Sequence, residues 1–125
     1  MLEEEGAGWR LARDSSKGHY PFVIGGDKWA VEITQSEWVS LGRIIFDLIK
    51  EHKKLKNQLL PDESICLELD RSPWWGCLDG DKNSWSLQLI LDGEVEETRS
   101  FEVFWPKPAA MNIAKAMRKL WNFSE

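Results

Sequence analysis

The adjacent tryptophans Trp74 and Trp75 are the residues of this sequence best suited to contact a ligand. Neighbouring side chains on a strand point to opposite faces of the sheet, so a Trp74 in the core leaves Trp75 on the other face. Glu68 and Cys77 are predicted to share that face. An exposed indole can stack on nucleic-acid bases or anchor a protein interface. The alternative is that a second layer of the fold or a dimer partner covers this face.

A cluster of lysines offers a second chemistry, the neutralisation of phosphate groups. The cluster consists of Lys50, Lys53, Lys54 and Lys56. Lys50 and Lys54 lie one helical turn apart, so these side chains can form a single patch. The alternative is a solvated helix end, where the helix dipole favours cations. A looser basic set, with the same alternative, consists of Arg10, Arg13 and Lys17.

The cysteines and histidines do not predict a metal or redox site. If Arg71-Ser72 forms a two-residue turn, Cys66 and Cys77 lie directly opposite each other on neighbouring strands. A disulfide between them would need Cα atoms within about 7 Å, but their spacing fits no zinc or redox motif, and we expect reduced thiols. His19 falls in a turn and His52 on an apolar helix stripe, so they do not complete a zinc site. We therefore expect no metal, no cofactor and no catalytic residues.

The acidic residues of the predicted hairpin loops are expected to be solvated. Asp79-Gly80-Asp81 lacks the longer pattern of a calcium-binding loop and its closing glutamate. The remaining acidic loop residues are Asp92, Glu94, Glu96 and Glu97. No histidine is placed by the sequence beside a serine or cysteine nucleophile, although the fold could bring them together. These residues favour a binding protein over an enzyme.

Alternation of apolar and polar residues predicts the strands that position these side chains. The predicted strands cover residues 9–12, 20–24, 28–33, 64–70, 74–78, 85–91 and 101–105. Gly25-Gly26-Asp27 is predicted to supply the positive-φ residues of a tight hairpin. A later hairpin is predicted to pair Ile65 with Leu78, Leu67 with Gly76 and Leu69 with Trp74, which keeps its inner face apolar. The residues expected to share a common interior include Trp29, Leu67, Leu87 and Val103.

Two amphipathic helices are predicted to cover the strands. Thr34-Gln35-Ser36-Glu37 is a capping box that starts the first helix. The apolar stripe of this helix consists of Trp38, Leu41, Ile45, Leu48, His52 and Leu55. Pro106-Lys107-Pro108 precedes the second helix, at whose start proline is favourable. The apolar residues of the second helix are Ala110, Ile113, Ala114, Met117, Leu120 and Trp121, and its outer face carries Lys115, Arg118 and Lys119.

Composition bounds the class of protein. The chain has 125 residues, 42% of them hydrophobic, and a chain of this size buries a core without disulfides or metal. We expect one α+β domain over residues 1–125, with residues 1–7 frayed. The net charge of −5 and the pI of about 5.1 exclude a general affinity for nucleic acid, so such binding would need a local basic patch. The sequence shows no secretory signal and no membrane span, so we expect a cytoplasmic protein with no membrane partner.

The order of predicted elements is three strands, a helix, four strands and a helix. Short connections without strand–helix–strand alternation favour antiparallel sheets with helices packed on them. A weak internal repeat supports a chain of two halves, each of three or four strands and a helix. The repeat consists of Gly26-Asp27-Lys28 and Gly80-Asp81-Lys82. The alternative fold is a cystatin-like helix on one curved antiparallel sheet.

Several runs of the sequence resemble a family of small cyanobacterial proteins of unknown function. These runs are Gly8-Trp9-Arg10-Leu11, residues 24–34 (IGGDKWAVEIT), Glu37-Trp38 and Trp105-Pro106. The resemblance spans residues 6–122 and implies a Whirly-like fold, that of single-stranded-DNA-binding transcriptional regulators. That fold has two halves of four strands and a helix, so a fourth strand is expected in the N-terminal tail or within residues 13–19. No functional residues follow from the resemblance.

The sequence thus predicts a tryptophan-rich, non-enzymatic binding or regulatory module of unknown specific function. The first alternative is a single-stranded nucleic-acid-binding domain, and the second is a protein-interaction domain or a homodimer. The candidate binding surface consists of Trp75, Glu68 and Cys77, with Lys50, Lys53 and Lys54 at its rim.

Overall fold

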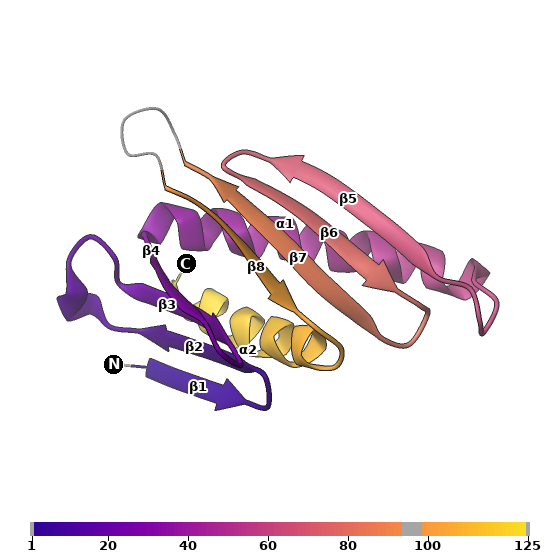
Figure 1. Cartoon of the computed structure of the whole chain (residues 1–125), viewed down its shortest axis with the longest axis horizontal. Coiled ribbons are helices and arrows are strands. Elements are labelled where there is room, and N and C mark those ends of the chain that lie inside the picture. Colours follow the sequence, from indigo (N-terminus) through magenta and orange to yellow (C-terminus); the bar gives the residue numbers. More distant parts are fainter. Residues whose placement is uncertain (1, 94–98, 125) are drawn as a thin grey trace.

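Among the described residues, ten main helices and strands form two successive halves, each of four strands followed by a helix (Figure 1). The computed structural model describes residues 2–93 and 99–124, with side chains up to Leu120. The first half consists of β1 (Leu2–Gly6), β2 (Trp9–Arg13), β3 (Phe22–Gly26), β4 (Ala30–Ile33) and α1 (Gln35–Leu55). The second half consists of β5 (Ile65–Arg71), β6 (Trp74–Gly80), β7 (Trp85–Asp92), β8 (Ser100–Trp105) and α2 (Ala109–Ser124). Glu94, Glu96, Glu97 and the side chain of Trp121 lie outside the described residues.

The strands form two antiparallel sheets, one from each half. The strand order is β1-β2-β3-β4 in the first sheet and β5-β6-β7-β8 in the second. This arrangement confirms the predicted α+β class with antiparallel sheets and two helices. The cystatin-like alternative is wrong because the strands form two sheets instead of one curved sheet.

The fourth strand of the first half lies in the N-terminal tail. Residues 1–7 were expected to be frayed, but Leu2–Gly6 forms β1, which pairs with β2 from Leu2 opposite Arg13 to Gly6 opposite Trp9. Two features hold this strand. Gly6 leaves room for the Trp9 indole, which would collide with a Cβ there, and Glu4 binds Lys119 of α2 at 3.1 Å. The glutamate-rich sequence concealed a strand that is stabilised by its partners.

The predicted hairpin geometry at Gly25-Gly26-Asp27 is wrong. Gly25 and Gly26 belong to β3, and the positive-φ glycines of the described residues are Gly8 and Gly18. Gly26 is required for a different reason, because a Cβ at this position would overlap the Trp29 indole.

The predicted β5–β6 register is wrong by two residues. The turn consists of Ser72-Pro73 instead of Arg71-Ser72, so that Leu67 lies opposite Leu78 and Leu69 opposite Gly76. A shift of two keeps every side chain on its predicted face. Cys77 therefore lies opposite Glu68, and the two cysteines are diagonal neighbours on one face.

The core contains residues of both sheets and both helices. The buried residues include Leu11, Ile24, Leu41, Ile45, Leu87, Val103 and Ile113. Trp29 and Leu67 are half-buried against this cluster, which confirms the predicted common interior. A buried hydrogen bond also joins the sheets, since Trp105 Nε1 donates to the Gly25 carbonyl at 2.9 Å. Within the described residues, neither helix is long and apolar enough to cross a membrane.

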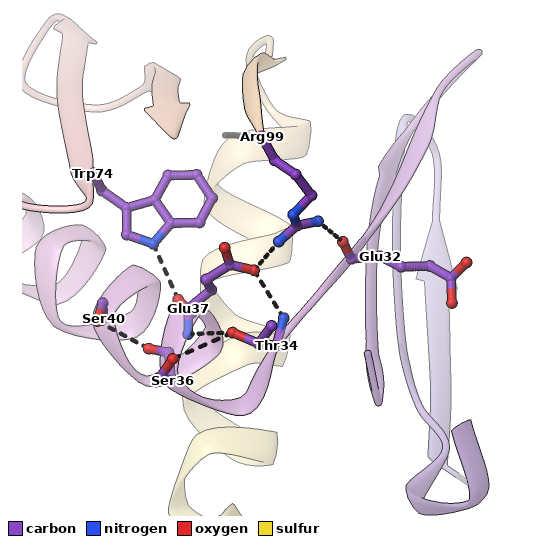
Figure 2. Close-up of polar contacts among 7 residues, drawn as sticks. All are labelled: Glu32, Thr34, Ser36, Glu37, Ser40, Trp74 and Arg99. Carbon is purple, nitrogen blue, oxygen red and sulfur yellow. Dashed lines mark hydrogen bonds and ion pairs between the residues drawn. The ribbon is translucent and has the colours of Figure 1, made fainter. Parts of the chain in front are cut away.

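The start of α1 binds both sheets through Glu37 (Figure 2). The predicted capping box is present: Thr34 N–H donates to Glu37 Oε1 at 2.9 Å, and Glu37 N–H donates to Thr34 Oγ1 at 3.1 Å. Arg99, just before β8, forms an ion pair with the same carboxylate oxygen and donates to the Glu32 carbonyl of β4 at 2.7 Å. Trp74 of β6 donates to the Glu37 carbonyl at 3.0 Å. The first turn of α1 is thereby fixed against β4, β6 and the start of β8.

Replacing Glu37 by glutamine should lower the free energy of unfolding by about 2 kcal/mol, because the half-buried Arg99 guanidinium loses its counter-charge. Glu37 and Arg99 side chains are 15% and 29% exposed. Urea denaturation of Glu37→Gln against the natural protein measures this difference.

The matched control is Asp47→Asn. Asp47 pairs with Arg71 at 3.9 Å, and both side chains are about half exposed, so the expected change is below about 0.5 kcal/mol. Equal effects of the two substitutions would show that Glu37 has no special part in joining the sheets.

Candidate functional site

The outer face of the second sheet carries the predicted aromatic platform. Trp74 is buried under α1 and Trp75 is half-buried on the opposite face, as predicted. Trp75 lies opposite Ile90, and the row across the sheet is completed by Asp70 on one side and Glu102 on the other. This face therefore presents an apolar pair between two carboxylates.

The charge of this outer face is negative. Its outward acidic residues are Glu68, Asp70, Asp79, Asp92 and Glu102. No lysine or arginine occupies an outward position in β5–β8. Stacked bases would bring phosphates with them, and the face offers carboxylates where those phosphates would need cations. Its chemistry is unfavourable to nucleic acid.

The structure does not bring the predicted lysines to this face. Lys50, Lys53 and Lys54 belong to α1, which packs on the inner side of the sheet against β5 and β6 (Figure 1). Lys54 pairs with Glu51 at 3.4 Å on the exposed side of the helix. Lys53 instead lines a pocket, as does Lys56.

The looser basic set is also not brought together as a binding site. Arg10 pairs with Glu3 at 3.9 Å and Lys17 pairs with Glu32 at 3.8 Å. The Arg13 guanidinium lies 5.8 Å from the centre of the Phe22 ring. These local partners fit a solvated surface.

A pocket of about 340 Å³ lies between the C-terminal half of α1, the β6–β7 turn and α2. Its cationic side chains are Lys53, Lys56, Lys82, Lys115 and Arg118. Its remaining lining residues are Ile49, His52, Asn83, Trp85, Met111 and Ala114. The pocket thus combines an apolar and aromatic floor with cations from three segments, and none of the described acidic residues lines it. We call it the basic pocket.

Buried contacts position the floor of the basic pocket. His52 is only 4% exposed, and its Nε2–H donates to the Asp81 carbonyl at 2.8 Å. The His52 ring meets the Trp85 ring edge-on, with centroids 6.3 Å apart. The hydrogen bond between His52 and Asp81 holds the β6–β7 turn against α1, next to the pocket.

The β6–β7 turn is held by the Asp81 carboxylate. Its Oδ1 accepts from the backbone N–H groups of Asn83 at 2.8 Å and Ser84 at 2.9 Å. These two hydrogen bonds lower the pKa of Asp81 below its ordinary value of 3.8. The turn in this conformation places Lys82 and Asn83 at the pocket.

The positive charge of the basic pocket is not neutralised within the described part of the chain. None of its five cationic side chains forms an ion pair with a carboxylate there. Arg118 packs its guanidinium 4.5 Å from the centre of the Phe46 ring. Such a site can attract an anion, because unpaired cations around an apolar floor strengthen the local field.

Sequence reasoning found only part of this site. Lys53 and Lys56 were recognised as a cluster, and Lys115 and Arg118 as the outer face of a helix, but Lys82 stood out only as part of the repeated Gly-Asp-Lys motif and not as a binding residue. Their convergence depends on how α1, the turn and α2 pack, which the linear sequence does not show.

Asp81→Ala should destabilise the protein most at neutral pH and progressively less in acid. The folded pKa of Asp81 is depressed, so its contribution is full above the unfolded pKa and is lost as pH falls through the folded pKa. Urea denaturation of both proteins at a series of pH values measures the difference. A difference that stays constant, or that grows towards acid, would contradict the proposed bonds of the turn.

Comparison with known proteins places the chain in a family. No curated protein matches it. A solved crystal structure, described as a protein with unknown function from the DUF155 family of Prochlorococcus sp. NATL2A, is 42% identical, with a TM-score of 0.92 over 97% of this chain and 99% of that chain. This relative supports the cyanobacterial resemblance. The family described as "Domain of unknown function (DUF1818)" matches residues 4–120, and the chain belongs to that family.

Proposed function

We propose that the protein is a non-enzymatic binding module that holds a small organic anion in the basic pocket. The observation that carries this proposal is the convergence of five cationic side chains over a floor that contains Trp85, with no carboxylate of the described residues among them. The volume of about 340 Å³ lies in the range of small-molecule sites.

The lining indicates the chemistry of the ligand. Ile49, Trp85 and Met111 would contact a hydrocarbon or aromatic body, whose burial contributes binding free energy. The lysines and Arg118 would bind a phosphate or several carboxylates, since Arg offers a bidentate fork and Lys a point charge. A phosphate monoester of a ring-sized group satisfies both parts.

The lining favours binding over catalysis. Among the described side chains, no serine, threonine, cysteine or acidic residue lines the pocket. His52 lines it, but its Nε2 is engaged by the Asp81 carbonyl and its ring is buried. An acid–base or nucleophilic mechanism would need a second group beside this histidine.

Single-stranded nucleic acid is the second candidate. The repeated order of four strands and a helix supports the Whirly-like resemblance, whose regulators bind single-stranded DNA. Fold likeness is a weak guide to function. Because the face of Trp75 is acidic, we expect a nucleic acid to contact the cations of the basic pocket instead.

Isothermal titration with 1-naphthyl phosphate at low salt tests the proposal. The natural protein should bind it more tightly than it binds 1-naphthol, which lacks the charge, and the affinity should fall as salt rises. The double substitution Lys53→Glu with Arg118→Glu should weaken binding by about tenfold or more, because it reverses two charges that face the ligand.

The matched control is Lys54→Glu, next to Lys53 but outside the pocket and paired with Glu51. It should leave the affinity within about twofold. Equal losses in both variants, or no binding by the natural protein, would overturn the proposal. A mixed single-stranded oligonucleotide that binds at low salt, while 1-naphthyl phosphate does not, would favour the second candidate.

A further inference from the structure

Two thiols and two carboxylates meet on the outer face of the second sheet. Cys66 and Glu68 of β5 face Asp79 and Cys77 of β6 in two adjacent rows. The Cys66 and Cys77 sulfurs are 3.0 Å apart. The ligand atoms of Cys66, Glu68 and Cys77 all lie within 4.8 Å of one another. We call this group the thiol–carboxylate cluster.

The cluster concentrates negative charge, and no lysine or arginine lies at an outward position of β5–β8 to offset it. Asp79 lies directly opposite Cys66, and every outward position of β5–β8 that carries a charge carries an acidic one. Burial, then the hydrogen bond with Cys66, then the charges of its neighbours raise the pKa of Cys77 to about 12.

The geometry points to a binding site for a soft divalent cation of the zinc class, with Cys66, Cys77 and Glu68 as ligands. Tetrahedral zinc binds thiolate sulfur at about 2.3 Å and carboxylate oxygen at about 2.1 Å. Two sulfurs at that distance are separated by about 3.8 Å. The two sulfurs, 3.0 Å apart in the structure, would have to separate by about 0.8 Å to hold such an ion.

The ligand set selects the class of ion. Thiolates favour zinc, cadmium and cobalt over magnesium and calcium, which prefer oxygen ligands. The neighbouring carboxylates also attract a divalent cation, which cancels their mutual repulsion. Binding then releases the thiol protons, so the affinity should rise with pH.

Titration of the reduced full chain with Co²⁺ tests the site, because thiolate–cobalt bonds give a near-ultraviolet charge-transfer band. A thiol assay first shows that both cysteines of the natural protein are reduced. The reduced protein should then develop this band and should lose it when added Zn²⁺ replaces Co²⁺. Cys66→Ser and Cys77→Ser should each remove most of it, and Glu68→Gln should weaken Co²⁺ binding by about tenfold or more.

Asp70→Asn is the matched control, because Asp70 lies on the same strand and face as Glu68, two residues along and outside the cluster. Its Co²⁺ affinity should equal that of the natural protein. Circular dichroism checks that each variant folds, and the exposed Cys66 keeps the test valid if Cys77→Ser does not fold.

Any one of several results would overturn the site. They are no band in the reduced natural protein, an undiminished band in Cys66→Ser, and an equal loss of affinity in Asp70→Asn and Glu68→Gln. A pair that remains a disulfide under reducing conditions would likewise exclude metal binding. The cluster lies on the outer face of the sheet and shares no residue with the basic pocket, so this result and the anion titration are independent.

Discussion

The contact between the Glu37 carboxylate and the Arg99 guanidinium is the constraint on which the arrangement of the two halves depends. Among the described strands, none of the first sheet pairs with a strand of the second, so packing and a few polar contacts must set their relation. Glu37 caps its own helix and binds Arg99, which reaches β4. Helix α1 has 21 residues, so its other end lies about 30 Å from this fixed first turn. His52 and Lys53, near the far end of α1, are therefore placed against the β6–β7 turn.

The same packing separates charge of opposite sign onto two sides of the second sheet. Its inner side holds α1, whose end contributes cations to the basic pocket, and its outer side carries only carboxylates among its charged strand residues. The net charge of −5 conceals this division. An acidic protein can thus offer an anion site and a cation site, because local fields depend on which charges are neighbours. The acidic outer face is also unfavourable to a symmetric dimer, which would oppose like charges.

Local patterns predicted the elements well, and long-range placement poorly. The capping box at Thr34 and the inward alternation of β7 depend on neighbours in sequence, so the sequence reveals them. The β5–β6 register depends on which two residues form the turn, and Ser72-Pro73 was not distinguishable from Arg71-Ser72 by pattern. The pattern of residues did not reveal strand β1, whose stability comes from β2 and α2, and only the family resemblance led to a fourth strand being expected, in the N-terminal tail or within residues 13–19. Lys82 lines the basic pocket only because the β6–β7 turn lies next to α1 and α2, which the sequence does not show.

The central claim is that anions bind beside Trp85 and not at the face of Trp75. Nitrogen–proton correlation spectra of the ¹⁵N-labelled protein resolve the indole N–H signals, and single Trp→Phe variants assign them. During titration with 1-naphthyl phosphate, the Trp85 indole signal should shift with saturation while the Trp75 signal stays in place. A saturating shift of Trp75 with an unmoved Trp85 would contradict the account.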